Sequence, residues 1–497
     1  MCGAFNLQLS NRGPSEFKLS LVGSRGISMR MLNPKALFLL FVPLFSQEVS
    51  EFHGVRLPSS FFASNRQRLI QELKKMGPGT LAIVKSMPLQ YRNGDTTHAY
   101  RQDSDFYYLT GVEEAESIAL IHGDQVKPYT LLVRAADARR ERYDGPRLGI
   151  QGALALGADT AERFPEAEKV LQKAVREATR IVLINNFDDE FRQKILNLVY
   201  PLGSDNASAS MKKILIDGRN LIGEMRLIKQ PLEIDMIQKA VDVSIEGHRA
   251  AQERSLSATN EGQVAGAFEG RVRSLGARFL GYDTIAGAYD NTCVLHYPYS
   301  DKSVFRDQLF LMDAAAEIGF YTADITRTWP VDGTFSPEQA QIYRLVYGAQ
   351  EAALAKIKPG ARHQEGYLAA MRFMSDGLVD LGILKGNKET VFNSRAWANF
   401  TMHGISHWLG LDVHDTGSYR DIKGSDPNGR LLEAGMVLTV EPGLYIPVGT
   451  PGVDTKWQGI GVRIEDAVLV TPNGYRNLSE QLPRTLESVE KFLQSKK

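Results

Sequence analysis

The segment LFLMDAAAEIGFYTADITRTW, residues 309–329, contains two apolar runs that each carry one aspartate. A two-residue loop at positions 318 and 319 would fold it into a β-hairpin with Asp313 opposite Asp324. Both carboxylates would then point to one face, with their Cβ atoms about 5 Å apart, where like charges destabilise a sheet. A divalent metal ion between the two aspartates would remove this repulsion. A shared proton, or the guanidinium of Arg327, would also do so.

Two further acids occupy similar settings. Glu441 in VLTVEPG and Glu465 in GVRIEDA each stand at the end of an apolar, strand-like run. Buried carboxylates cost free energy unless they are paired or bind a metal. Four such carboxylates predict a metal site, and a site rich in oxygen ligands favours a hard ion such as manganese. Four carboxylates can hold two ions, and a pair of ions activates water and stabilises an oxyanion, as in aminopeptidases.

The segment TMHGISHWLGLDVHDTG, residues 401–417, holds three of the nine histidines of the chain, namely His403, His407 and His414. His403 and His407 are four residues apart, as in the helical zinc motif HExxH. Gly404 stands where that motif requires glutamate, and glycine disfavours a helix, so the motif does not match. A single histidine is ordinarily a core residue. Three of them in the same half of the chain as four carboxylates favour a role in the metal site.

The length of 497 residues predicts two domains of unequal size. From about residue 60 to 217, apolar runs such as TLAIVKS, SIALIHG, YTLLVRA and RIVLINN alternate with charged helical patterns, which indicates an α/β domain. A long amphipathic helix is predicted from residue 231, a helix-rich stretch over 337–381, and β-rich segments after it. The predicted boundaries are an N-terminal extension, 1–54, an α/β domain, 55–221, and an α+β domain, 222–497.

Charge and cysteine content exclude several classes of function. The formal net charge is zero and no block of lysine and arginine is present, which argues against nucleic acid or a membrane surface as the main partner. The two cysteines, Cys2 and Cys293, provide neither a disulfide framework nor a cysteine metal site. Cys293 lies three residues before His296, so a nucleophilic pair is one interpretation. The preferred interpretation is a buried, unreactive thiol.

The apolar run ALFLLFVPLFS, from Ala36 to Ser46, follows the basic residues Arg30 and Lys35. It is short for a membrane span but fits the central region of a secretory signal. No cleavage site with small residues is evident. The run favours an exported protein, periplasmic or secreted; the alternative is a cytoplasmic protein in which this segment is buried.

The metal-binding candidates resemble a known arrangement. In chain order, Asp313, Asp324, His407, Glu441 and Glu465 are similar to the five-ligand dinuclear site of the "pita-bread" metallopeptidases, which include methionine aminopeptidase, prolidase and aminopeptidase P. Five blocks resemble aminopeptidase P: HAYRQDSDFYYLTGV, ERYDGPRLG, DITRTWPVDGTFS, HGISHWLGLDVHD and GMVLTVEPGLYI. The resemblance extends from about residue 55 to 480. It implies a creatinase/aminopeptidase P-like α/β domain followed by an α+β pita-bread catalytic domain.

The resemblance also implies a role for each ligand. Asp324 and Glu465 would bridge two divalent ions, with Asp313 as a further carboxylate ligand and His407 completing one coordination shell. Glu441 would bind metal and also move a proton. The ions would be Mn²⁺, with Zn²⁺ or Co²⁺ as alternatives.

Four further residues would surround the substrate or the ligands. His296, in CVLHYPY, and His414 would face the scissile amide, and His403 would line the pocket for a proline ring. Arg463, two residues before Glu465, would orient a carboxylate ligand.

The activity implied by the resemblance is hydrolysis of the bond between an N-terminal residue and a proline in second position. One alternative is a prolidase restricted to dipeptides. Another is a non-catalytic peptide-binding protein on the same scaffold. The resemblance further implies a homo-oligomer, a dimer or a tetramer.

Overall fold

The computed structural model describes residues 8–11, 17–20, 57–185, 188–200, 213–420 and 429–497. The chain divides into two compact units, Met1–Gly54 and Val55–Lys497. In the first unit, β1 (Gln8–Asn11) pairs antiparallel with β2 (Phe17–Ser20). The segment from Ala36 to Ser46 lies outside the described residues, as does Cys2. None of the helices within the described ranges is long and apolar enough to cross a membrane.

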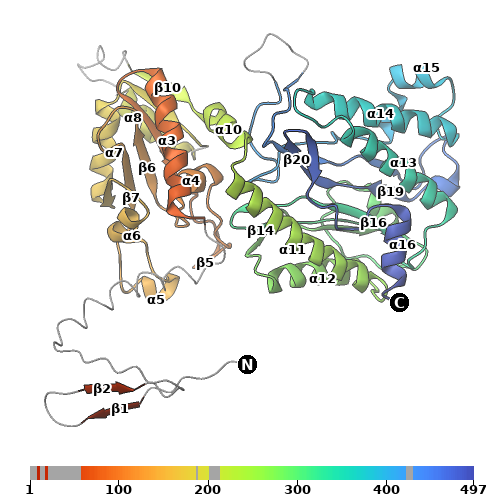
Figure 1. The fold of residues 1–497 in the computed structure, drawn as a ribbon, viewed down its shortest axis with the longest axis horizontal. Helices are drawn as coiled ribbons and strands as arrows, with labels where there is room; N and C mark the ends of the chain where they lie inside the picture. The colour runs from red at the N-terminus through yellow and green to blue at the C-terminus, as the bar shows by residue number, and fades with distance from the viewer. Residues whose placement is uncertain (1–7, 12–16, 21–56, 186–187, 201–212, 421–428) are drawn as a thin grey trace. The chain divides into compact units, whose positions relative to one another are not determined.

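The second unit begins with a six-stranded sheet in the order β10-β9-β3-β6-β7-β8 (Figure 1). Its strands are β3 (Thr80–Lys85), β6 (Ile118–His122), β7 (Tyr129–Val133), β8 (Thr160–Arg163), β9 (Arg180–Leu183) and β10 (Ile214–Asp217). The neighbours β3 and β9 run parallel, whereas β6 is antiparallel to both β3 and β7. The four apolar runs read as strands in the sequence all form strands of this sheet.

Helices cover both faces of the sheet, as the alternation along β3 requires. Ala82 and Val84 belong to the core that α3 (Ser59–Met76) and α4 (Ser104–Thr110) share. Leu81 and Ile83 belong to a separate core with α7 (Glu166–Glu177) and α8 (Asp189–Val199). The smaller elements are β4 (Tyr91–Asn93), β5 (Thr96–Thr97), α5 (Glu141–Asp144) and α6 (Gly149–Ala155).

Helices and short strands form the C-terminal α+β domain, which α10 (Arg219–Leu227) precedes. The longer helices among its described residues are α11 (Pro231–Ser255), α12 (Glu261–Ser274), α13 (Pro337–Leu354), α14 (His363–Asp380) and α16 (Leu486–Gln494). Both α11 and α13 begin with a proline at the first position and a capping box, signals that fix where a helix starts. Helix α11 packs on α12 and against β14 and β15, and α13 packs on α14 (Figure 1).

Short antiparallel sheets lie between these helices, in the orders β11-β14-β15, β12-β13-β16, β17-β20-β21 and β18-β19. The strands are β11 (Phe279–Leu280), β12 (Ile285–Ala288), β13 (Leu309–Asp313), β14 (Ala316–Ile318), β15 (Tyr321–Thr322), β16 (Thr326–Pro330), β17 (Val437–Val440), β18 (Gly443–Ile446), β19 (Ile460–Arg463), β20 (Asp466–Thr471) and β21 (Gly474–Asn477). The remaining elements are η3 (Tyr289–Cys293), α15 (Lys388–Asn393), η4 (Ala396–Asn399) and η5 (Thr455–Trp457).

The hairpin of residues 309–329 forms, but its predicted register was wrong. Ile318 pairs with Tyr321, so the loop consists of Gly319 and Phe320, with φ angles of 58° and 70°. A two-residue loop of this kind needs positive φ at both positions, which a β-branched isoleucine resists and a glycine accepts. Asp313 consequently lies opposite Thr326 rather than Asp324.

Packing against the N-terminal α/β domain accounts for a phenylalanine at the second loop position. The Phe320 ring stacks on Tyr107 of α4, with 3.9 Å between ring centroids. The guanidinium of Arg101 lies over the Phe320 ring, 5.4 Å from its centroid. These contacts offset the cost of a positive φ at a residue with a side chain. The tip of the hairpin is therefore fixed by residues distant in the sequence.

Candidate metal centre and active-site cleft

A cleft of about 1000 Å³ opens in the C-terminal domain between the short sheets and the stretch of residues 403–414. All nine predicted site residues line it, namely His296, Asp313, Asp324, His403, His407, His414, Glu441, Arg463 and Glu465. They come from positions up to 169 apart in the chain (465 minus 296). Folding therefore brings every candidate into one cavity.

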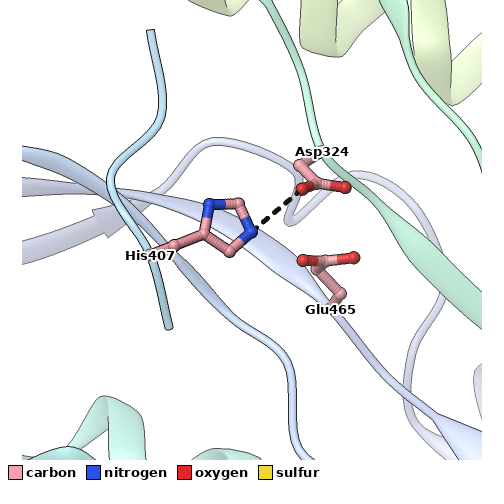
Figure 2. A group of neighbouring side chains, drawn as sticks. All are labelled: Asp324, His407 and Glu465. Atoms are coloured by element: carbon pink, nitrogen blue, oxygen red, sulfur yellow. Dashed lines mark ion pairs between the residues drawn. The ribbon is translucent and has the colours of Figure 1, made fainter. Parts of the chain in front are cut away.

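Asp324, His407 and Glu465 form the centre of this group (Figure 2). One ligand atom from each lies within 4.8 Å of the other two. His407 Nε2 is 3.3 Å from Asp324 Oδ2 and 3.5 Å from Glu441 Oε1. Asp324 lies just before β16, and Glu465 lies between β19 and β20. Three such ligand atoms so close together form a group that can hold a divalent cation.

The surroundings of His407 orient its ring. Its Nδ1 is 3.1 Å from the carbonyl oxygen of Trp408, and its backbone pairs with Thr439 of β17. A proton on Nδ1 donates to that carbonyl, which leaves the lone pair of Nε2 directed at the carboxylates. Residues 401–407 are irregular rather than helical, in agreement with the expectation from Gly404.

Asp313 lies at the end of β13 and has two close partners. Its Oδ2 accepts a hydrogen bond from Arg463 Nη2 at 2.7 Å, and its Oδ1 contacts the hydroxyl of Tyr282. That hydroxyl also lies 2.5 Å from Asp324 Oδ1, so one phenol bridges the two aspartates. A hydroxyl has one proton to donate and cannot satisfy both carboxylates at once. Tyr282 was missed in the sequence, where no spacing or motif distinguishes it.

Arg463, not Arg327, is the arginine beside the aspartates. Its buried guanidinium also donates to the Tyr445 hydroxyl at 3.0 Å and to Thr326 Oγ1 at 3.2 Å. Arg327 instead pairs with Asp466, 2.7 Å away, and donates to the backbone carbonyl of Glu465. The alternative in which Arg327 neutralises the two aspartates was therefore wrong.

The electrostatics of the cluster call for additional positive charge. Burial, reinforced by the charge of Asp313, raises the pKa of Asp324 well above its ordinary range. Burial and the charge of Asp324 likewise raise the pKa of Glu465 well above its ordinary value. Burial and the charge of Glu465 raise the pKa of Glu441 in the same way. Among the described residues, no lysine or arginine forms an ion pair with any of these three acids. Divalent ions fit this site because they supply the missing charge.

The three other histidines stand around the cluster. His403 Nε2 is 2.8 Å from the Tyr445 hydroxyl, and burial lowers the pKa of His403 to about 4, so its ring is neutral at pH 7. The His414 ring lies 4.2 Å from the His407 ring, and partial burial lowers its pKa. His296 is exposed to the cleft. These three rings can contact a ligand in the cavity.

Cys293 is a free, buried thiol that packs against Leu311 and Tyr445. Burial raises the pKa of this thiol to about 12, which keeps it protonated. Since the thiolate is the nucleophilic form, the pairing with His296 has no chemical support, and the preferred interpretation as an inert thiol holds.

Comparisons with known proteins agree with this geometry. The model of the aminopeptidase P N-terminal domain matches residues 62–183, and that of metallopeptidase family M24 matches residues 235–472. The chain is 35% identical over 442 residues to a Xaa-Pro aminopeptidase of Haemophilus influenzae, covering 88% of this chain and 98% of that one.

Solved structures are similar over the same extent. The aminopeptidase PepP of Pseudomonas aeruginosa matches with a TM-score of 0.84 and 36% identity, over 89% of this chain and 99% of that one. Escherichia coli aminopeptidase P with the inhibitor Pro-Leu matches with a TM-score of 0.82 and 34% identity, over the same two shares.

Proposed function

The chain belongs to metallopeptidase family M24, and we propose that Asp313, Asp324, His407, Glu441 and Glu465 bind two divalent metal ions in its pita-bread domain. The protein is a metal-dependent hydrolase, an aminopeptidase that removes the N-terminal residue from peptides with proline in second position. The observation that carries the two-ion proposal is the convergence of four carboxylates and one imidazole, without a sufficient counter-charge, in one cleft. The oxygen-rich donor set favours Mn²⁺, with Zn²⁺ or Co²⁺ as alternatives.

Within this set, Asp324 and Glu465 lie with His407 at the centre, and these two carboxylates would be shared between the ions. Arg463 holds the carboxylate of Asp313, and the carbonyl oxygen of Trp408 holds the His407 ring, whose Nε2 is 3.3 Å from Asp324 Oδ2. When bound, divalent ions would acidify a water molecule and stabilise negative charge on the carbonyl oxygen of the substrate.

The side chains around the cluster would manage protons and position the peptide. Glu441, whose pKa is raised by burial, would accept the proton of the attacking water and deliver it to the proline nitrogen. This delivery matters because the amide nitrogen of proline leaves poorly until it is protonated. His414 and His296 would donate hydrogen bonds to the scissile amide, and neutral His403 would form a wall of the proline pocket.

A peptide-length assay combined with metal analysis tests the proposal. We expect hydrolysis of Xaa-Pro-Xaa peptides with release of the first residue, and elemental analysis should find two ions per chain. Asp324→Ala should lose both metal and activity, whereas Asp307→Asn, a change at an exposed acid before the same hairpin, should retain both. Activity on Xaa-Pro dipeptides alone would show a prolidase. Wild-type metal content in Asp324→Ala would contradict the assigned ligands.

Two further properties are proposed, the oligomeric state and the location of the protein. The family resemblance supports a homo-oligomer. Light scattering of the purified protein decides between monomer, dimer and tetramer. The apolar run from Ala36 to Ser46 supports export, which N-terminal sequencing of the protein from its natural source would test.

A further inference from the structure

His414 belongs to a short loop, residues 411–415, that we call the His414 loop. Two of its members, Asp412 and Asp415, flank the histidine. Both carboxylates point away from the cleft towards the junction with the N-terminal α/β domain, where a set of cationic side chains meets them. The support of this loop therefore comes from outside the metal centre.

Arg226, at the end of α10, is the central cation of this junction. It is 3% exposed, and its Nη2 contacts Asp415 and lies 2.8 Å from Asp412 Oδ2. Its Nη1 lies 2.6 Å from Asp105 Oδ1, in the first turn of α4. One planar guanidinium thus joins both acids of the His414 loop to the N-terminal domain.

Further contacts hold the same loop. Lys229 Nζ donates to Asp415 Oδ2 at 2.9 Å, and both side chains are buried. Ser104 Oγ donates to Asp412 Oδ1 at 2.6 Å, and Arg101 Nη2 donates to the carbonyl oxygen of Leu411 at 2.6 Å. Arg101 and Ser104 belong to the N-terminal domain, so this domain holds the backbone and one side chain of the loop.

A gain in stability alone explains this cluster poorly. Buried ion pairs pay a desolvation penalty that can match their attraction, and apolar residues of similar size would often stabilise the fold as well. The planar guanidinium of Arg226 donates its hydrogen bonds in fixed directions and so fixes the positions of the carboxylates that accept them. The geometry matters here because the His414 ring lies 4.2 Å from the ring of His407, and misplacement of a reacting group by about 1 Å can cost about a hundredfold in rate.

We propose that Arg226 is a positioning residue for the peptidase reaction, which together with Asp105 and Ser104 of the N-terminal domain holds the His414 loop in its reactive geometry. The inference rests on the proposed role of His414 at the scissile amide. It gives the N-terminal domain a part in turnover within its own chain.

The first test is the kinetics of Arg226→Gln. We expect kcat to fall by about ten- to a hundredfold, with KM changed less than about threefold and metal content unchanged. Arg226→Lys should recover part of the loss, because it restores the charge but cannot reach Asp105, Asp412 and Asp415 together. Arg134→Gln is the matched control, since Arg134 pairs with Glu114 inside the N-terminal domain and does not contact the loop.

A double-mutant cycle separates positioning from general destabilisation. If Arg226 acts through His414, Arg226→Gln should change kcat by less than about twofold in the His414→Ala background. An equal loss of kcat in both backgrounds would overturn the inference. Full activity of His414→Ala would overturn the proposed role of His414 and the inference with it, so the two failures are distinguishable.

Ser104→Ala provides a second variant in case Arg226→Gln does not fold. It removes the hydrogen bond to Asp412 and the one that Ser104 Oγ accepts from Arg101 Nη1, but no charge, so the fold should persist. We expect a smaller loss of kcat, again abolished by His414→Ala. Two results together would overturn the inference. Folded Ser104→Ala would have wild-type kcat, and Arg226→Lys would lower kcat equally with His414 present and in the His414→Ala background.

Discussion

Arg463 donates a 2.7 Å hydrogen bond from Nη2 to Oδ2 of Asp313, and the arginine is buried beside the carboxylate that it orients. Arg463→Lys should lower metal affinity or kcat/KM by about ten- to a hundredfold, because an ammonium keeps the charge but loses the contacts to Thr326 and Tyr445. Metal titration and steady-state kinetics measure both. Wild-type values in a folded Arg463→Lys would show that charge alone suffices.

Replacing His407 and replacing His414 should have different consequences. His407→Ala removes a nitrogen directed at the carboxylates, so most bound metal should be lost. His414→Ala should keep the metal and lower kcat by about a hundredfold, the scale of removing one hydrogen-bond donor from a transition state. Elemental analysis beside kinetics checks both variants, and the reverse pattern would refute the division of roles.

Tyr282→Phe should destabilise the metal-free protein more than the metal-bound one. The phenol contacts Asp313 and Asp324, and its loss leaves buried carboxylates with fewer hydrogen-bond donors, at a cost of about 1–2 kcal/mol. Bound ions would offset most of that cost. Denaturant unfolding with and without Mn²⁺ measures the difference, and an equal loss under both conditions would contradict it.

The stabilisation that metal confers should grow with pH. Burial raises the pKa values of Asp324 and Glu465 above their ordinary 3.8 and 4.5. A carboxyl group with a raised pKa in the folded state favours folding below its ordinary pKa, and this contribution is lost as pH rises through the raised value. In the metal-free protein, the stability that these two groups contribute is therefore lost as pH rises from about 4 upward. Bound ions would offset this loss, because they pair with the ionised carboxylates.

Thermal unfolding across pH 5 to 8, with and without metal, tests this expectation. The gap in Tm between the two forms should widen with pH, and it should narrow at every pH in Glu465→Gln. A gap that does not depend on pH would contradict the raised pKa values.

The hairpin turn should tolerate little change at Gly319. Its φ of 58° disfavours a side chain, so Gly319→Ala should lower the free energy of unfolding by about 1–2 kcal/mol. Gly266→Ala, inside α12 with open space around it, is the control and should stabilise the protein by about 0.5–1 kcal/mol. Denaturant unfolding measures both, and a neutral Gly319→Ala would show that the loop adapts.

Local patterns in the sequence predicted much of the fold. The strands β3, β6, β7 and β9 and the helix α11 follow from apolar periodicity, because burial on one or both faces imposes that pattern. Four site candidates, Asp313, Asp324, Glu441 and Glu465, were also recoverable from local patterns, since carboxylates at the ends of apolar runs are costly without a metal. His296 and Arg463 entered only through the family resemblance. The structure places all nine in one cleft, while the individual roles assigned to them stay predictions.

The features that the sequence did not predict depend on contacts between segments distant in the chain. The hairpin register is set by turn geometry together with the stack of Phe320 on Tyr107. Tyr282 is an ordinary residue of its segment until folding brings both aspartates to its hydroxyl. The hydrogen bond from Arg226 to Asp105 joins residues that are 121 positions apart in the chain.

The stack of Phe320 on Tyr107 bears on how this enzyme can be divided or recombined. Its neighbouring ion pair joins Arg101 to Glu317 across 216 positions, so the first domain leaves the ribosome well before the hairpin that it will hold. A C-terminal half expressed by itself would present an aromatic turn and a buried acid to water. Chimeras between related enzymes should therefore exchange residues 101–107 and 317–320 as a matched pair.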